Sequence, residues 1–219
     1  LNREKSKKEH DIKIKDIKNT KNNYPIMFHN ILINPNFIFN TFPKSKVIFI
    51  DRDPVDLIYS WNKKKYHGQF YSNPRNLTLT FKFKKKFYPF WCQGYENEFV
   101  KLNNNYEKTI FLLDKLYSVQ KKNYLKYKKK YIKNILLLKY EKLTQETDVE
   151  IKKIEKFLNS KKSKFTASEI KKQSGNRDKT SSIREIRREQ IIKNISDKFK
   201  KKLVKLKRLY SKRWNLQKI

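Results

Sequence analysis

An arginine and a serine eight residues apart form a pair that can hold a phosphate group. Arg52 follows the apolar run Val47–Ile50, which is short and rich in β-branched residues and therefore predicts a buried strand. Asp53 is a good N-cap and Pro54 fits the first helical position, so a helix carrying Ser60 should begin there. A guanidinium fork and a hydroxyl at this strand end, beside a helix N-terminus, suit a phosphate dianion. We therefore expect an anion site at Arg52.

Arg52 has a structural alternative, because it could instead pair with Asp56 across the predicted turn. Ser60 alone carries little information, since most helical serines are solvated or bond to their own backbone. The spacing of Arg52 and Ser60, and their strand–turn–helix context, favour ligand binding.

The apolar pattern of the remaining chain predicts an α/β protein. Continuous apolar runs predict further buried strands at 26–33 and 135–140. Strands separated by helical segments predict a parallel sheet in a single domain over residues 1–219. Helical periodicity predicts helices at 36–42, 54–65, 95–121 with an extension to 133, 148–158, and a C-terminal helix at 183–216 with Ser196 capping its second half.

The segments between these elements are polar or rich in turn-forming residues. Residues 66–90 predict a long surface loop with some helix, and residues 160–182 predict another loop. We interpret the basic run Lys82–Lys86 as a solvated part of the first loop, with a groove for an anionic glycan as the alternative. Residues 1–23 are poorly defined and predict either a short helix or a mobile segment.

The chain is strongly basic, with a formal net charge of +34 from 55 Lys and Arg against 21 Asp and Glu. Such a charge suits a polyanionic partner such as nucleic acid, a glycan or a membrane surface. Only nine of the basic residues are arginine, however, and lysine is spread along the whole chain. Phosphate-reading surfaces favour arginine, so a Lys- and Asn-rich coding composition explains the charge better, and we expect no specific nucleic-acid partner.

Cysteine and apolar content exclude several classes of protein. The single cysteine, Cys92, cannot form an intramolecular disulfide, and no Cys/His spacing resembles a zinc site. No apolar run approaches the roughly 18–20 residues of a membrane span. We expect a cytoplasmic protein without a membrane span. Because the chain begins at Leu1 rather than at Met, we also expect a fragment.

The segment Lys46–Ser60 resembles the 3′-phosphate-binding segment of sulfotransferases. That segment is a strand, an arginine, an Asp-Pro or Asn-Pro turn, and a helix with a serine eight residues after the arginine. The resemblance implies the three-layer α/β fold of that family, with a parallel sheet of the P-loop NTPase-like type. It also implies that Arg52 and Ser60 hold the 3′-phosphate of 3′-phosphoadenylyl sulfate (PAPS), the sulfuryl donor. The resemblance implies no metal.

His29 resembles the catalytic histidine of cytosolic sulfotransferases in its position. It ends the predicted strand 26–33 and lies 23 residues before Arg52. The resemblance implies that His29 removes the proton of the acceptor hydroxyl; a merely buried or hydrogen-bonded histidine is the alternative. Met27 stands where the family often has a lysine.

Two further segments resemble family landmarks. Residues 135–143, followed by 150–159, are similar to a strand that ends in Tyr-Glu and a helix that closes with Phe-Leu-Gly or Phe-Leu-Asn. This resemblance implies that Tyr140 lies near the adenine of the donor. Arg177, in the segment 175–179, is a loose counterpart of the basic C-terminal loop that closes over the 3′-phosphate.

One landmark of the family is missing from its expected place. The 5′-phosphosulfate loop, Pro-Lys-Ser-Gly-Thr-Thr or a variant, should precede all these motifs, and residues 1–24 contain nothing like it. The run Thr41–Lys46 is superficially similar, but it lacks the glycine that lets the backbone wrap a phosphate. We therefore expect an N-terminally truncated chain that lacks part of the donor site.

The resemblance implies a sulfotransferase that transfers a sulfuryl group from PAPS to a hydroxyl or amine of a small-molecule or carbohydrate acceptor, with activity of the fragment depending on the missing loop. The alternative is a non-catalytic module that binds nucleic acid or an anionic glycan through its basic surface. The sequence indicates neither the identity of the acceptor nor the oligomeric state.

Overall fold

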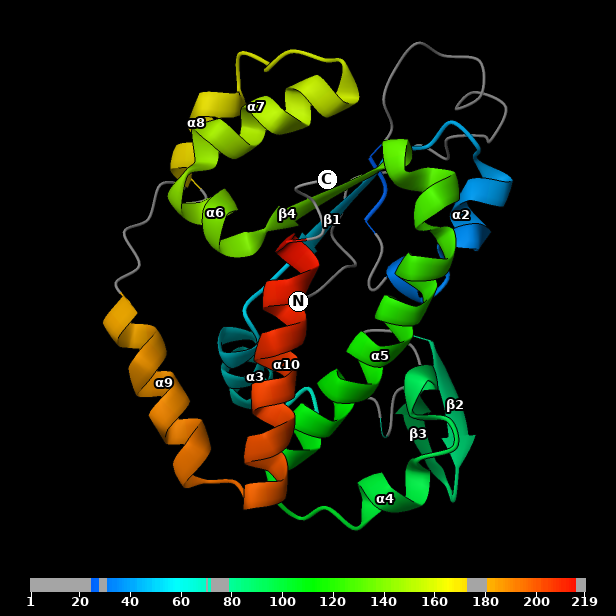
Figure 1. The fold of residues 1–219 in the computed structure, drawn as a ribbon, viewed down its shortest axis with the longest axis vertical. Helices are drawn as coiled ribbons and strands as arrows, with labels where there is room; N and C mark the ends of the chain where they lie inside the picture. Colours follow the sequence, from blue (N-terminus) through cyan, green and yellow to red (C-terminus); the bar gives the residue numbers. More distant parts are fainter. Residues whose placement is uncertain (1–24, 28–30, 70, 72–78, 173–180, 216–219) are drawn as a thin grey trace, which may run out of the picture.

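A computed structural model describes residues 25–27, 31–69, 71, 79–172 and 181–215. These residues form a mixed α/β fold in which most elements are helices (Figure 1). With η denoting a 3-10 helix, the elements in chain order are η2 (Ile31–Ile33), α2 (Pro35–Thr41), β1 (Val47–Asp51), α3 (Pro54–Lys63), β2 (Thr80–Phe83), β3 (Lys86–Pro89), η3 (Phe90–Cys92), α4 (Glu96–Val100), α5 (Asn105–Tyr131), η4 (Ile132–Asn134), β4 (Ile135–Lys139), α6 (Tyr140–Gln145), α7 (Thr147–Leu158), α8 (Thr166–Lys172), α9 (Ser181–Lys193) and α10 (Asp197–Asn215).

Strands β1 and β4 pair in parallel, as predicted from their apolar runs. The register aligns Val47 with Ile135 at one end and Asp51 with Lys139 at the other. Their interior residues are largely aliphatic, and Leu137 and Leu138 are buried. Helices α3 and α5 lie in the crossover between the two strands, which is the connection that a parallel pair requires.

The turn from β1 into α3 confirms the prediction made from Asp53 and Pro54. The Asp53 carboxylate accepts a hydrogen bond of 2.8 Å from the backbone N–H of Val55, and Pro54 occupies the first helical turn. Val55 and Ile58 are completely buried, so one side of α3 packs into the core. The capping carboxylate and the proline therefore fix where the helix leaves the strand.

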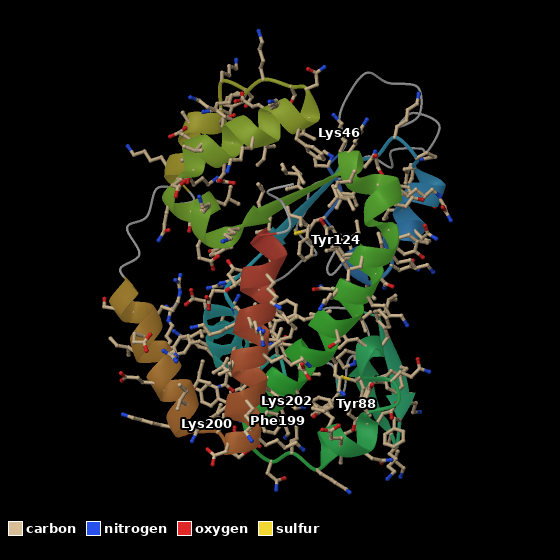
Figure 2. The ribbon with its side chains drawn as sticks, viewed as in Figure 1. Lys46, Tyr88, Tyr124, Phe199, Lys200 and Lys202 are labelled. Atoms are coloured by element: carbon tan, nitrogen blue, oxygen red, sulfur yellow. The ribbon has the colours of Figure 1, made fainter. Side chains whose placement is uncertain are left out.

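Helix α5 is the element around which the core is built. It contacts α3, α10, η2 and η3, and the four residues 110–113 are fully buried. Phe199 of α10 and Tyr88 of β3 belong to the same hydrophobic cluster, and Figure 2 shows both beside the first half of α5. One long helix thus joins segments that are more than a hundred residues apart in the chain.

The predicted surface loop at 66–90 is wrong over its second half, where β2 and β3 form an antiparallel hairpin. Phe83 and Lys86 are its last paired residues, so the basic run Lys82–Lys86 forms strand ends and a turn rather than an irregular loop. Lys84 and Lys85 occupy the turn with φ angles of 44° and 68°. Two successive residues in the left-handed region match the tight turns that suit the twist of a hairpin, although asparagine or glycine is usual there.

Two other expectations also need correction. The predicted strand 26–33 is wrong over its described end, because Ile31–Ile33 form the 3-10 helix η2, and Ile26 and Met27 are exposed. The predicted loop 160–182 contains helix α8. The helices predicted at 36–42 and 148–158 are confirmed within a few residues of their ends, whereas the helix predicted at 95–133 is divided into α4 and α5 by a break at residues 101–104.

The C-terminal helix predicted at 183–216 consists of two helices. Helix α9 ends at Lys193 and α10 begins at Asp197, and the carbonyl of Ser196 accepts the first bonds of the second helix, from the N–H groups of Phe199 and Lys200. Ser196 therefore precedes a new helix, as its expected capping role implied. Within the described residues, no helix is long and apolar enough to cross a membrane.

The tight packing of α10 on α5 and α3 predicts a large difference between two neighbouring positions on α10. Leu206 is fully buried, whereas Val204 is 64% exposed. We expect Leu206→Ala to lower the free energy of unfolding by about 2–5 kcal/mol, because it leaves a cavity. Val204→Ala should change it by less than about 0.5 kcal/mol. Urea unfolding of both variants and the parent chain measures the difference; equal losses would show that α10 is not packed as described.

Candidate functional site

The parallel register of β1 and β4 brings Arg52 against Tyr140. Each residue directly follows the last paired residue of its strand, Asp51 or Lys139. The Cζ atom of Arg52 lies 4.7 Å from the centroid of the Tyr140 ring, within the range of a cation–π contact. Two of the predicted site residues, 88 positions apart in the chain, are therefore in direct contact at the carboxyl ends of the strands.

The Arg52 side chain keeps hydrogen-bonding capacity that the described residues leave unused. Its Nε is buried without a hydrogen-bond partner there, and its guanidinium forms no ion pair with any described carboxylate. The backbone of Arg52 is fixed instead: its N–H donates to Asp51 Oδ1 at 3.1 Å, and its carbonyl accepts from the Tyr117 hydroxyl at 3.3 Å. A fixed backbone and an unsatisfied, partly buried guanidinium are properties of an anion-binding arginine.

Asp53 and Glu141 hold the two strand ends together one residue further on. The backbone N–H of Asp53 donates to Glu141 Oε1 at 2.9 Å. The other oxygen of Glu141 accepts a 2.8 Å hydrogen bond from the hydroxyl of Tyr210 on α10. Burial and the neighbouring Glu141 carboxylate raise the pKa of Tyr210, so this phenol remains a donor. The start of α6, the start of α3 and the end of α10 are thereby tied to one carboxylate.

The alternative partner considered for Arg52, Asp56, is engaged by α9 instead. Arg187 donates to Asp56 Oδ1 at 2.5 Å, and Arg184 contacts Oδ2 at 3.3 Å. The guanidinium of Arg187 also lies 4.8 Å from the centroid of the Tyr59 ring. Burial works against the charge of Arg184, but Asp53 and Asp56 outweigh it and raise its pKa. Two arginines on one buried carboxylate therefore fix α9 against α3, and Asp56 forms no ion pair with Arg52.

Ser60 lies on α3 one helical turn after Asp56. Residues four apart share a helix face, so Ser60 is on the side of α3 that Asp56 turns toward α9. Its side chain is half-buried, and its hydroxyl makes no hydrogen bond within the described part of the chain. Its position is compatible with a ligand contact and does not by itself require one.

The remaining predicted site residues, His29 and Arg177, lie outside the described residues. The structure therefore brings Arg52 and Tyr140 together and places Ser60 on the adjoining helix.

Several residues that shape the site were not anticipated from the sequence. Tyr117 and Tyr210 have no local signal, because their partners are distant in the chain, and the sequence indicated Glu141 only as part of the Tyr-Glu landmark. Arg184 and Arg187 had one: three of the nine arginines fall within residues 184–188, in a chain that otherwise uses lysine. A cluster of arginines in a lysine-rich chain indicates a need for the planar guanidinium group. In this case Arg184 and Arg187 both contact the buried carboxylate of Asp56.

Two other residues with potentially reactive side chains, Cys92 and His67, have pKa values that are shifted mainly by burial. Cys92 is fully buried in the core, and burial raises the pKa of its thiol to about 12, so it is not a nucleophile at neutral pH. Burial, with help from Lys108 and Lys65, lowers the pKa of His67. In the described part of the chain, no group of three or more His, Cys, Asp or Glu side chains is arranged to hold a metal ion.

Together these features define an α/β protein in which an arginine with a buried, unsatisfied Nε lies where two parallel strands end. A family model described as the sulfotransferase domain matches residues 5–212, so the chain belongs to the sulfotransferase family. No curated protein and no solved structure matches it. Membership of this family makes the chain a member of a class of group-transfer enzymes.

The buried position of Asp53 generates a prediction about pH. Burial raises the pKa of Asp53 above the ordinary value of 3.8 and outweighs the hydrogen bond from Val55 and the charge of Arg184. Between the ordinary and the raised pKa, the folded state binds more protons than the unfolded state, so rising pH lowers the stability. Asp53→Asn keeps a capping oxygen and should remove this loss. Relative to Asp53→Asn, the parent chain should therefore become less stable as the pH rises from about 4 to 7.

Urea unfolding across this pH range measures the effect, and Asp197→Asn is the control of opposite sign. The hydrogen bond and charge of Lys200 lower the pKa of Asp197, so its contribution is present above the ordinary pKa and lost as the pH falls. Parallel stability curves for the parent and Asp53→Asn would contradict the assigned pKa direction.

Proposed function

We propose that this chain acts in sulfuryl transfer, with PAPS as donor and a hydroxyl or amine of a small-molecule or carbohydrate acceptor. The observation that carries the proposal is Arg52: its guanidinium lies against Tyr140 at the strand ends, with a buried Nε that no described residue satisfies. Family membership supports the reaction class. The identity of the donor and the roles of the site residues are our own proposal.

The surroundings of Arg52 favour a phosphate as its partner. Stacking on Tyr140 restricts the plane of the guanidinium and leaves its N–H edge for an acceptor. A buried N–H without a partner costs about 1–3 kcal/mol, and an anion at that edge would remove this cost. A doubly charged phosphate can accept two parallel N–H bonds from the fork. We assign this place to the 3′-phosphate of the donor, with the Ser60 hydroxyl as a second contact.

The remaining donor contacts follow from the same geometry. In this proposal the Tyr140 ring contacts the adenine, and its stacking on Arg52 keeps base and 3′-phosphate in fixed relation. Arg177 adds a further positive charge to the phosphate. It precedes α9, and the pairs of Arg184 and Arg187 with Asp56 hold that helix against α3. The three-layer, P-loop NTPase-like form of the fold also remains a proposal, supported by the parallel β1–β4 pair and the helix that directly follows β1.

The residues of the chain would act mainly by positioning and by charge. The donor supplies the sulfuryl group, which passes in line to the acceptor oxygen or nitrogen. Arg52, Ser60 and Tyr140 hold the adenosine part of the donor in place, which supplies proximity and orientation. His29 takes the proton that the acceptor hydroxyl loses as its oxygen attacks sulfur. Positive side chains stabilise the negative charge that develops on the departing phosphate.

Binding of adenosine 3′,5′-bisphosphate, the desulfated form of the donor, tests the role of Arg52. We expect Arg52→Ala to weaken binding by about 10- to 100-fold, the loss of one or two charge-assisted hydrogen bonds. Ser60→Ala should weaken it by about fivefold, as for one hydrogen bond. Isothermal titration calorimetry measures both effects. Arg188→Ala is the matched control, since Arg188 is an exposed arginine that pairs with Glu185 on α9. Equal affinity of the parent and Arg52→Ala would refute the assignment of the phosphate site.

Turnover tests His29 separately from donor binding. With radiolabelled PAPS and a panel of phenols, amines and carbohydrates, we expect His29→Ala to lower kcat by about 100-fold or more, because a general base is lost. Affinity for the bisphosphate should stay unchanged, since His29 acts on the acceptor. His10→Ala is the control, as one of the other two histidines of the chain. A variant with undiminished turnover would exclude His29 as the base.

A further inference from the structure

The second half of α5, continued by the 3-10 helix η4, is a basic segment without acidic residues. Residues 121–133 contain seven lysines and no Asp, Glu or Arg. The side chains of five of these lysines are described, and all five are exposed. We call the surface that they form the α5 basic face: Lys121, Lys122, Lys126, Lys130 and Lys133.

The lysines of the α5 basic face form no ion pair with the described residues, unlike four of the lysines on α10. On α10, Lys198 and Lys202 pair with Glu98, and Lys205 pairs with Asp114. Figure 2 shows Lys202 beside the first half of α5, the helix that carries Asp114, whereas Glu98 belongs to α4. Like charges without counter-charges repel one another. Contact with an anionic surface would therefore stabilise the α5 basic face.

Two exposed apolar side chains lie among these lysines. Leu125 is 50% exposed and Ile132 is 51% exposed, although both are aliphatic residues that usually lie inside a protein. Leu125 lies on α5 next to Lys126, and Ile132 begins η4 next to Lys133. The α5 basic face is therefore an amphipathic surface with apolar side chains between cations.

The opposite side of α5 is packed, so this surface has a fixed orientation. The Asn123 amide donates to the carbonyl of Ile33, and the ring of Tyr131 stacks on Phe39 of α2 at 4.1 Å between centroids. The Tyr131 hydroxyl also lies 3.4 Å from the side-chain oxygen of Asn36. These contacts hold η2 and α2 against α5 and leave the lysines facing outward.

We propose that the α5 basic face docks this protein on an anionic lipid membrane surface. Lysines near a bilayer that contains acidic lipids are attracted to its surface potential, and Leu125 and Ile132 can enter the headgroup region between them. A nucleic acid or a sulfated glycan would satisfy the lysines but not the two apolar side chains. Such partners are also read mainly by arginine, which this segment lacks. The proposal does not depend on the proposed function, because it uses none of the donor-site residues.

Co-sedimentation of the full chain with vesicles tests the proposal. The vesicles are phosphatidylcholine alone, and phosphatidylcholine with about 30% phosphatidylserine. We expect binding to the acidic vesicles only, weakening with added salt. The combined change of Lys121, Lys122, Lys126 and Lys133 to Gln should lower the vesicle partition coefficient at least about tenfold.

The matched control removes the same charge elsewhere. Lys152, Lys156, Lys161 and Lys164 are exposed, form no ion pair in the described structure, and lie on α7 and the segment before α8 among acidic residues. Their combined change to Gln should lower vesicle binding by less than about threefold. Circular dichroism verifies that both quadruple variants are folded.

A second variant separates a lipid surface from a soluble polyanion. Leu125→Ser with Ile132→Ser should lower binding to acidic vesicles at least about threefold and leave any binding to heparin or duplex DNA unchanged. Three results would overturn the proposal. The first is equal binding to neutral and acidic vesicles, or binding to neither. The second is an equal loss in the α7 control. The third is vesicle binding that the Leu125 and Ile132 changes do not affect.

Discussion

The register of β1 against β4 is the constraint on which the site depends. Asp51 faces Lys139 as the last pair of the ladder, and the same offset of 88 residues places Arg52 on Tyr140 and the Asp53 N–H on Glu141. A slip of one residue would turn each side chain to the other side of the sheet, so none of these contacts would survive. The buried aliphatic ladder thus sets the geometry of the polar groups beyond its end.

A second feature of the site is its local charge, which opposes that of the chain. The carboxylates of Asp51, Asp53, Asp56 and Glu141 gather at the strand ends of a protein with a net charge of +34. Each is engaged by a backbone N–H, a tyrosine hydroxyl or an arginine. These acidic groups therefore act as fixed points that orient helices α3, α9 and α10, and the Arg52 guanidinium forms an ion pair with none of them.

Local signals predicted the elements, whereas distant contacts decided how the elements meet. The apolar runs, Asp53 and Pro54 were enough to predict β1, β4 and the start of α3, because those signals act within a few residues. The link of Asp56 to Arg184, across 128 residues, has no local counterpart in the sequence. The hairpin was missed for another reason: Lys84 and Lys85 adopt a turn whose usual markers, asparagine and glycine, are absent. The roles of His29 and Arg177 come from the family resemblance alone, because both residues lie outside the described part of the chain.

The backbone at Lys65, Lys84, Lys85 and Asn159 has a further consequence for how this chain is composed. All four residues have positive φ angles, although the chain contains only three glycines. A lysine in the left-handed region costs roughly 1–2 kcal/mol relative to its ordinary conformations, and glycine there costs almost nothing. Lysine stands at three of these four positions, in a backbone conformation that suits glycine. Glycine at Lys65, Lys84 or Lys85 would therefore relieve local backbone strain without any change to the core.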